Sequence, residues 1–251
     1  MEHLEVGRYW NDNAEVWTRL ARQGYDLYRD RLNTPAFFAM LPDVRELSGL
    51  DIGCGEGYNT RLLAARGGRV SAVDISEVFI AHAREEERRA PLGIDYRVAS
   101  MVALPFGDAT FDFAIACMSL MEVAETERTF AEVFRVLRPG GFLQFSIEHP
   151  CYATRHRRNL RDADGRTYAF EVGGYFRPLR GEVEEWIFGA APAEVKAGLR
   201  RFRVPRFTRP LSDWLNHIIG AGFTIERAEE PCPSDETVRE VPYVQDAQVV
   251  A

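Results

Sequence analysis

The chain reads Leu50-Asp51-Ile52-Gly53-Cys54-Gly55-Glu56-Gly57 between an apolar run and a helical pattern. Three glycines on alternate positions let the backbone turn sharply and come close to a ligand. The helix that follows offers unpaired N–H groups at its N-terminus. The spacing is G-x-G-x-G rather than the G-x-G-x-x-G of dinucleotide-binding loops. Because Asp51 would repel a pyrophosphate and attract an ammonium group, the segment predicts a loop that binds a ligand with an ammonium group rather than a nicotinamide dinucleotide.

Residues 47–147 alternate between strand and helix patterns on either side of this loop. Strands are expected at 50–52, 70–74, 94–98, 111–117 and 142–147, and helices at 60–66, 77–89 and 126–137. Ser76 is the expected cap of the second helix, and Pro139-Gly140-Gly141 is expected to separate the third helix from the fifth strand. The alternation predicts an α/β fold, a doubly wound parallel sheet with helices on both faces.

Two regions flank the alternating part. Residues 1–46 are rich in aromatic residues and arginine and are predicted to form a helical lid, with Asn11, Asp12 and Asn13 as candidate caps and a helix at 35–40. Residues 47–251 form the main predicted domain, with an insertion after the fifth strand at about 150–210. A last helix is expected at 212–220 with Ser212 as its cap, followed by a strand from Phe223 to Ile225.

Length and charge restrict the function classes. A chain of 251 residues suits one domain with an appended lid. Its net charge of -7 and pI of about 5.4 disfavour a non-specific grip on nucleic acid or on an anionic membrane. No apolar run approaches the ~18 residues of a membrane helix. The four cysteines form neither a CxxC pair nor a cluster with histidine, so we expect reduced thiols, no metal site and a cytoplasmic location.

Asp74 ends the second predicted strand, within Val73-Asp74-Ile75-Ser76. A carboxylate at this point can accept hydrogen bonds from both hydroxyls of a ribose. The alternative is an aspartate that caps the next helix, a role for which Ser76 competes. The glycine loop before it favours the ribose interpretation.

Further motifs follow in order: Ala99-Ser100-Met101-Val102, Leu104-Pro105-Phe106, Phe111-Asp112-Phe113 and Leu137-Arg138-Pro139-Gly140-Gly141. Together with the glycine loop and Asp74, they resemble the class I S-adenosylmethionine-dependent methyltransferases, and the type 11 group closely, over about residues 47–147. The resemblance implies a Rossmann-like fold, S-adenosylmethionine as cofactor and S-adenosylhomocysteine as product.

The resemblance also implies which residues contact the cofactor. They are Asp51, Gly53 and Gly55 at the methionine part, Asp74 at the ribose, Ile75, Ser100, Met101 and Val102 at the adenine, and Cys117 and Met118 beside the ribose and sulfonium. Trp17 is expected to cover the methionine end. The family usually has aspartate where Ser100 stands, and serine accepts a hydrogen bond without charge, so the adenine contact is expected to be weaker or different.

Three side chains are candidates for removing a proton from the acceptor. His149 is the first, because it follows the fifth strand at the edge where α/β sheets bind ligands; the alternative is a turn residue with one hydrogen bond. Tyr25 in the lid is the second, and its alternative is simple aromatic packing. Glu122, after the fourth strand, is the third, and its alternative is a solvated residue at the start of a helix.

Two stretches of the insertion leave alternatives open. The aromatic residues between Tyr168 and Trp186 either wall an apolar acceptor pocket or pack under a long loop. The arginines between Arg155 and Arg161 either contact an anionic substrate group or form a solvated face. The antiparallel strand that closes the family's sheet has no clear counterpart before Ala251, so either the chain continues or a partner completes the sheet edge.

The sequence therefore predicts an enzyme that methylates a small-molecule acceptor. Segments such as Trp10-Asn11, Gly24-Tyr25-Asp26 and Pro205-Arg206-Phe207 resemble a subgroup that modifies small metabolites and is similar to indole C3-methyltransferases, which suggests an indole or another aromatic precursor of secondary metabolism. The alternatives are an RNA or tRNA methyltransferase, which the acidic balance disfavours, and a non-catalytic cofactor-binding regulatory module, which Ser100 leaves open. We expect no nucleic-acid or membrane partner, and a homo-oligomer remains open.

Overall fold

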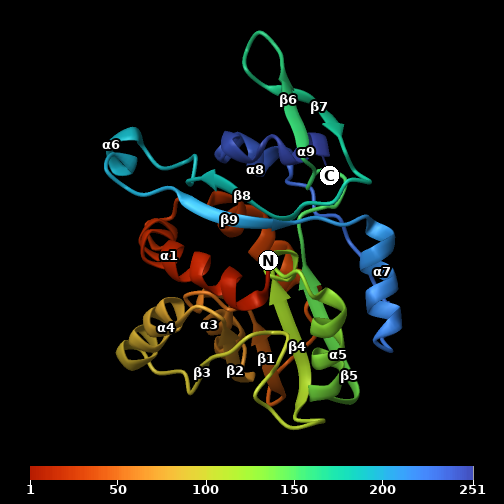
Figure 1. Cartoon of the computed structure of the whole chain (residues 1–251). Coiled ribbons are helices and arrows are strands. Elements are labelled where there is room, and N and C mark those ends of the chain that lie inside the picture. The colour runs from red at the N-terminus through yellow and green to blue at the C-terminus, as the bar shows by residue number, and fades with distance from the viewer. Residues whose placement is uncertain (251) are drawn as a thin grey trace.

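The computed structural model describes residues 1–250 and has a five-stranded parallel sheet at its centre (Figure 1). In chain order the strands are β1 (Ser48–Ile52), β2 (Arg69–Asp74), β3 (Asp95–Val98), β4 (Phe111–Cys117) and β5 (Leu137–Ser146). Their order in the sheet is β3-β2-β1-β4-β5, and every neighbouring pair is parallel. This confirms the doubly wound fold. The order reverses between β1 and β4, which places a ligand crevice at the carboxyl ends of these two strands.

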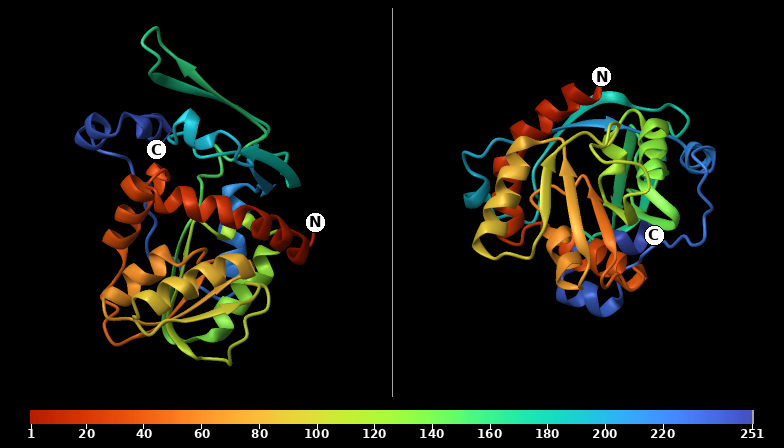
Figure 2. Two further views of the ribbon diagram at one scale, coloured as in Figure 1. Left: turned by 90° about the vertical axis from the view of Figure 1, so that its left-hand side faces the viewer. Right: turned by 90° about the horizontal axis from the view of Figure 1, so that it is seen from below.

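Helices cover both faces of the sheet (Figure 2). One face carries α2 (Thr34–Met40), α3 (Tyr58–Ala65) and α4 (Glu77–Arg89), and the other carries α5 (Thr126–Val136) and α7 (Leu211–Gly220). Strand β4 supplies both layers, since Phe113 and Ile115 pack with α2 and α3 while Ala114 and Ala116 pack with α5 and α7. The near-continuous apolar run of β4 is the consequence of burial on both sides.

The N-terminal helix α1 (His3–Arg22) includes the three residues that were predicted to cap it, and that prediction is wrong. Asn11 instead accepts hydrogen bonds from the Ser76 hydroxyl (2.7 Å) and the Val78 N–H (3.3 Å), at the start of α4. Asn13 bonds the backbone N–H and carbonyl of Arg203 at 2.9 Å each. These polar side chains fasten α1 to neighbouring elements. A π-helix, η1 (Arg29–Asn33), then leads into α2.

Strand β5 is longer than expected, because it begins at Leu137 and runs through Pro139-Gly140-Gly141. Leu137 pairs with Phe111, and the register shifts before Phe113 pairs with Phe142. A bulge thus absorbs the proline and glycines, which were predicted to separate helix from strand.

The insertion folds into two antiparallel hairpins, which the sequence did not predict. They are β6 (His156–Arg161) with β7 (Thr167–Gly173), and β8 (Arg180–Trp186) with β9 (Phe202–Phe207), with the short α6 (Ala193–Lys196) between β8 and β9. Figure 1 shows α1, β8 and β9 across the carboxyl end of the sheet, with the β6–β7 hairpin beyond them. Together with α1 and η1, the insertion roofs the crevice.

Two predictions for the C-terminal part are wrong. Helix α7 begins at Leu211 with Pro210 at its N-cap, so Ser212 lies inside the first turn. Residues 223–225 form no strand, because they have no ladder partner, and Phe223 packs edge-on against Phe134 of α5 with ring centroids 5.1 Å apart.

The last described segment crosses back to the roof as α8 (Asp235–Glu240), η3 (Pro242–Val244) and α9 (Ala247–Val250). Asp246 accepts hydrogen bonds from the Thr167 hydroxyl and the Asn159 amide, both at 2.6 Å, which ties this segment to the β6–β7 hairpin. Among residues 1–250, none of the helices has the length and apolarity required to cross a lipid bilayer.

Candidate functional site

A cavity of about 1810 Å³ lies between the carboxyl edge of the sheet and the roof. The predicted site residues that line it are Trp17, Tyr25, Asp51, Gly53, Gly55, Asp74, Ile75, Ser100, Met101, Cys117, Met118, Glu122 and His149. Val102 is not among the lining residues, since its side chain is fully buried, and its N–H donates to the Ser100 hydroxyl at 3.4 Å. The fold thus brings together residues that are more than a hundred positions apart in the chain.

The glycine loop forms the floor of the cavity at the end of β1. Gly53 and Gly55 both have a positive φ, +72° and +56°, which glycine adopts without strain. A Cβ at Gly53 would lie 2.5 Å from the Cβ of Ser119, whereas a Cβ at Gly55 would meet no heavy atom within 4 Å. The loop therefore leaves open space above Gly55, where a ligand can approach the backbone closely.

Two buried carboxyl groups stand beside this loop. Asp51 accepts a hydrogen bond from the Thr60 hydroxyl at 2.6 Å, and its burial raises its pKa to about 7. Asp74 accepts from the N–H groups of Gly55 (2.9 Å) and Ser76 (2.8 Å), and burial raises its pKa to about 6. Within the described chain neither has an ion-pair partner, so a cation or hydroxyl donors from a ligand would stabilise them.

The helix cap after β2 is Ser76, whose hydroxyl accepts from the Phe79 N–H at 3.2 Å. This confirms the cap that the sequence predicts. Asp74 instead accepts hydrogen bonds from the backbone after β1, at Gly55, and after β2, at Ser76. It therefore orients the glycine loop and still presents its carboxyl group to the cavity.

The end of β4 holds a strained residue at the cavity wall. Met118 has a φ of +53°, a conformation that non-glycine residues rarely adopt. Its N–H donates to the Ser146 carbonyl (3.0 Å), and the next hydroxyl, of Ser119, donates to the Ile52 carbonyl (2.7 Å). Such strain is concentrated at functional sites. Neighbouring Cys117 has its pKa raised to about 11 by burial, so its thiol stays protonated at neutral pH.

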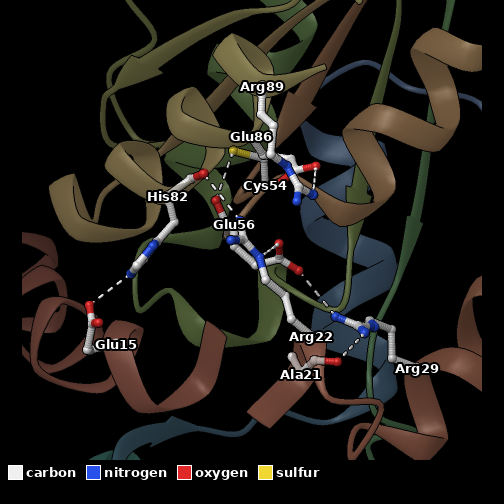
Figure 3. A network of polar contacts seen from close by, with 10 residues as sticks. Glu15, Ala21, Arg22, Arg29, Cys54, Glu56, His82, Glu86 and Arg89 are labelled. Atoms are coloured by element: carbon white, nitrogen blue, oxygen red, sulfur yellow. Dashed lines mark hydrogen bonds and ion pairs between the residues drawn. The ribbon is translucent and has the colours of Figure 1, made fainter. Parts of the chain in front are cut away.

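An ionic network joins the lid to the glycine loop (Figure 3). Glu56 of the loop lies 3.3 Å from both Arg22 of α1 and Arg29 of η1. Arg29 also donates to the Ala21 carbonyl at 3.1 Å and lies 4.0 Å from the centroid of the Tyr58 ring. The π-helix that begins at Arg29 is a rare element found often at functional sites. The sequence analysis did not single out this connection.

Trp17 belongs to an aromatic cluster under the roof. Its ring centroid lies 5.4 Å from that of Trp186, 4.9 Å from Phe188 and 4.8 Å from Phe202. Tyr25 packs against the same cluster and also reaches the cavity. Aromatic residues of the insertion therefore divide into two groups, since Trp186 lines the cavity while others, such as Phe176 at 81% exposure, do not.

His149 lies at the far side of the cavity with both ring nitrogens engaged. Its Nδ1 accepts from the Cys151 N–H at 3.2 Å, and its Nε2 lies 3.1 Å from Glu230. Glu122, on the short helix η2 (Leu120–Glu122), is half-buried, and burial raises its pKa to about 7. The positive charge of Arg206 lowers the pKa of Glu122, and the negative charge of Glu148 raises it further.

Three further charged residues reach the cavity: Arg157, from the arginine run that was a candidate contact for an anionic substrate group, and Glu148 and Arg206, which the sequence analysis did not propose as site residues. Glu148 lies between Arg157 (2.8 Å) and Arg206 (2.5 Å), and all three line the wall. The remaining arginines of the 155–161 run are paired with Glu182, Glu171 and Asp246. The sequence did contain one indication for Glu148, which is its position just after β5, at the edge of the sheet where ligands bind. Among residues 1–250, His, Cys, Asp and Glu side chains form no group of three that could hold a metal ion.

Comparisons with known proteins agree with this geometry. Residues 50–145 match the type 11 family model described as "Methyltransferase domain". An O-methyltransferase of Penicillium expansum is 33% identical over 155 residues, which cover 59% of this chain and 53% of that protein. A probable S-adenosylmethionine-dependent methyltransferase of Mycolicibacterium smegmatis is 36% identical, covering 59% and 58% of the two chains. The chain thus spans about half the length of these curated relatives.

A solved S-adenosylmethionine-dependent methyltransferase from Mesorhizobium loti is 30% identical, with a TM-score of 0.67 and coverage of 84% of this chain and 90% of that one. A putative methyltransferase from Listeria monocytogenes, 22% identical with a TM-score of 0.66, covers 85% and 90% of the two chains and shares the fold. The glycine loop, the two buried carboxyl groups of Asp51 and Asp74 and these matches lead to one assignment: the chain belongs to the class I S-adenosylmethionine-dependent methyltransferases of the type 11 group.

Proposed function

We propose that this protein transfers the methyl group of S-adenosylmethionine to a small organic acceptor held under the roof. The observation that carries the proposal is the cavity of about 1810 Å³. The glycine loop and the carboxyl ends of the strands line one side of it, and the aromatic residues of the roof line the other. Pockets for single small ligands usually measure about 300–1,000 Å³. The larger volume supports room for a cofactor and an acceptor together.

The residues present fit the cofactor that the family uses. We assign Asp51 to the ammonium group, the open space above Gly55 to the methionine chain and Asp74 to the ribose hydroxyls, supported by their common position in the cavity wall. Ile75, Met101 and Ser100 line the adenine side. When bound, S-adenosylmethionine supplies a methyl group on a sulfonium centre that leaves readily.

The chain's own task is then to orient the acceptor, exclude water and accept a proton where one must leave. Trp17 and Tyr25 line the cavity and pack in one cluster, and we assign to them and to the hairpins the exclusion of water. His149, Tyr25 and Glu122 remain the proposed proton acceptors. In the described structure the Glu122 carboxyl group carries no hydrogen bond, whereas His149 is engaged on both nitrogens.

An aromatic acceptor, such as an indole or another natural-product precursor, is the proposed class. Its support is the set of rings around the cavity: Trp17, Tyr28, Tyr152, Phe170 and Trp186. The relatives differ in the atom they methylate, since one is named an O-methyltransferase and another, from rice, a 24-methylenesterol C-methyltransferase. Names of relatives therefore do not select the acceptor atom.

The test is to incubate the full chain with S-adenosylmethionine and a panel of indoles, phenols, carboxylic acids and bulk tRNA, and to measure S-adenosylhomocysteine. Turnover with a small aromatic compound supports the proposal and eliminates the non-catalytic module. Salt-dependent binding and turnover of tRNA alone would favour the nucleic-acid alternative. Bound cofactor without turnover on any acceptor would favour the regulatory module.

Among the proton acceptors, His149→Ala separates the alternatives. If His149 is the base, turnover at saturating acceptor falls by about 10²–10⁴-fold. Undiminished turnover would leave His149 as a turn residue and direct the same test to Glu122→Gln and Tyr25→Phe.

A further inference from the structure

Most charges on the insertion side of the cavity are paired with one another. Glu148 bridges Arg157 at 2.8 Å and Arg206 at 2.5 Å, and Arg206 also lies 3.7 Å from Glu184. Asp246 faces Arg161 at 3.2 Å. A ligand that approached one of these charged side chains would have to displace its existing partner. These side chains are therefore expected to discriminate only weakly between cationic and anionic ligands.

Glu122 differs from these residues. It lines the same cavity and is half-buried, yet within residues 1–250 its carboxyl group makes no hydrogen bond and no ion pair. Arg206, the cation that acts on it, is already shared between Glu148 and Glu184. A partly desolvated carboxylate without a partner is stabilised when a ligand donates a hydrogen bond to it.

The backbone that carries Glu122 is held in place. Strand β9 packs against η2. Arg209, which follows that strand, donates to the Val123 carbonyl at 3.0 Å and the Ala124 carbonyl at 3.4 Å. Leu120 is fully buried at the other end of η2. The carboxyl group of Glu122 is therefore presented on a fixed turn at the carboxyl end of β4, where an acceptor must lie to face the cofactor.

Aromatic side chains form a second part of the cavity wall. Tyr152 lies between His149 and Phe170, with ring centroids 5.5 and 6.0 Å away. Trp17 and Trp186 also line the cavity, with centroids 5.4 Å apart. Aromatic faces attract cations through their quadrupoles, and they pack against planar apolar bodies.

We infer that Glu122 selects acceptors that carry a basic amine on an aromatic body, accepts neutral N–H or O–H donors less well, and disfavours anionic acceptors. This inference rests on the proposed function, because it assigns the substrate class of the same site. The unpaired carboxylate binds the ammonium group, and the surrounding rings hold the aromatic body beside it.

The experiment compares ligands of equal shape and different charge. The 251-residue chain, saturated with S-adenosylhomocysteine, is titrated at pH 8 with tryptamine, tryptophol and indole-3-propionate, and with phenethylamine, phenethyl alcohol and 3-phenylpropionate. Because Glu122 is ionised and the amines are protonated at this pH, each amine is expected to bind roughly 10- to 100-fold more tightly than its alcohol. The carboxylates are expected to bind most weakly.

Three variants test the residue. Glu122→Gln keeps the shape, removes the charge and is expected to abolish the preference for the amine. Glu122→Asp keeps the charge and is expected to retain the preference in part. Glu182→Gln is the matched control, because Glu182 is exposed, is paired with Arg155 and does not line the cavity. Affinity for S-adenosylhomocysteine in each variant shows that the site has folded.

Amines that bind no better than alcohols, or a preference that survives in Glu122→Gln with normal S-adenosylhomocysteine affinity, would overturn the inference. That result leaves the proposed function intact. Failure of the unmodified chain to bind S-adenosylhomocysteine or S-adenosylmethionine would instead contradict the proposed function, so the two failures are distinguishable.

Discussion

Asp51 and Asp74 carry the cofactor proposal at the scale of single residues. Both are buried, both accept hydrogen bonds from the protein, and neither has a basic partner within the described chain. Burying a carboxylate without a counter-charge is costly, and proteins tolerate this cost mainly where a ligand compensates for it. The two residues are therefore better explained by ligand binding than by stability.

Asp74→Ala tests the ribose contact. Loss of hydrogen bonds to a charged group is expected to weaken S-adenosylmethionine binding by about 1–3 kcal/mol, measured by calorimetric titration. Asp43→Ala is the control, since that carboxylate is exposed and paired only with Arg45. Affinity that does not change in Asp74→Ala would remove Asp74 from the ribose site.

The pH dependence tests Asp51. Burial raises the pKa of Asp51 from the ordinary range of an aspartate to about 7, so the free protein favours the protonated form below neutrality. The ammonium group requires the ionised form, and cofactor affinity is therefore expected to rise between pH 6 and pH 8 and then level off. By linkage, the raised pKa makes the unliganded fold lose stability as pH rises from about 4 to 7.

Thermal unfolding with and without S-adenosylmethionine from pH 6 to 8 measures both effects. The stabilisation by cofactor is expected to grow with pH. Stabilisation that is constant over this range would mean that Asp51 is already ionised, or that it does not face the ammonium group.

Residue types predicted a set of cofactor contacts, all of which line the cavity except Val102 and whose roles stay predictions, but residue types misled for the asparagines of α1. Asn11 and Asn13 are typical helix caps, and the sequence contains no sign that their partners are Ser76 and Arg203. The separation between Asn13 and Arg203 is 190 residues, so local preference could not reveal the contact. Here tertiary hydrogen bonds offset an unfavourable helix propensity.

At the scale of elements, α5 is held by aromatic packing. Phe130 is fully buried, with centroids 5.7 Å from Phe145 of β5 and 6.2 Å from Trp214 of α7. Phe130→Ala is expected to lower the free energy of unfolding by about 3–5 kcal/mol in denaturant titrations. Phe134→Ala, on the same helix but 47% exposed, is expected to cost about 1 kcal/mol or less. Equal losses would contradict the assignment of the core face.

The lid is coupled to the glycine loop through Glu56. Glu56→Gln removes the charge that Arg22 and Arg29 share, and both arginines are then left with weaker partners. Backbone amide exchange in residues 22–33 is expected to become several-fold faster. Glu15→Gln, which affects only the exposed contact with His82, is expected to leave exchange unchanged. Unchanged exchange in Glu56→Gln would show that packing alone fixes the lid.

Elements with a strong periodic signal were predicted well. Strand β4 has the expected bounds, because Phe111–Cys117 is a continuous apolar run buried on both faces. The hairpins were missed because β6 and β8 are rich in charged residues and largely exposed, so their sequences lack the apolar run of a buried strand. The strand expected at 223–225 failed for a different reason: a strand forms only where another strand pairs with it, and composition does not reveal that partner.

At the scale of the whole molecule, the site is assembled from segments that no local pattern connects. Glu122 follows β4, Glu148 follows β5, and Arg206 lies in β9, one residue before its end. Strand order explains why the first two meet, since β4 and β5 are neighbours whose carboxyl ends share one edge. The position of Arg206 depends on how the insertion folds back over the sheet, which the sequence did not disclose.

The same architecture gives the clearest test of the account. Calorimetric titration of the unmodified chain with S-adenosylmethionine, and then with S-adenosylhomocysteine, measures directly whether the crevice between β1 and β4 binds this cofactor. The account predicts one site per chain with a dissociation constant on the order of micromolar, or about 8 kcal/mol of binding free energy. Absence of binding by both compounds to the folded chain would contradict it.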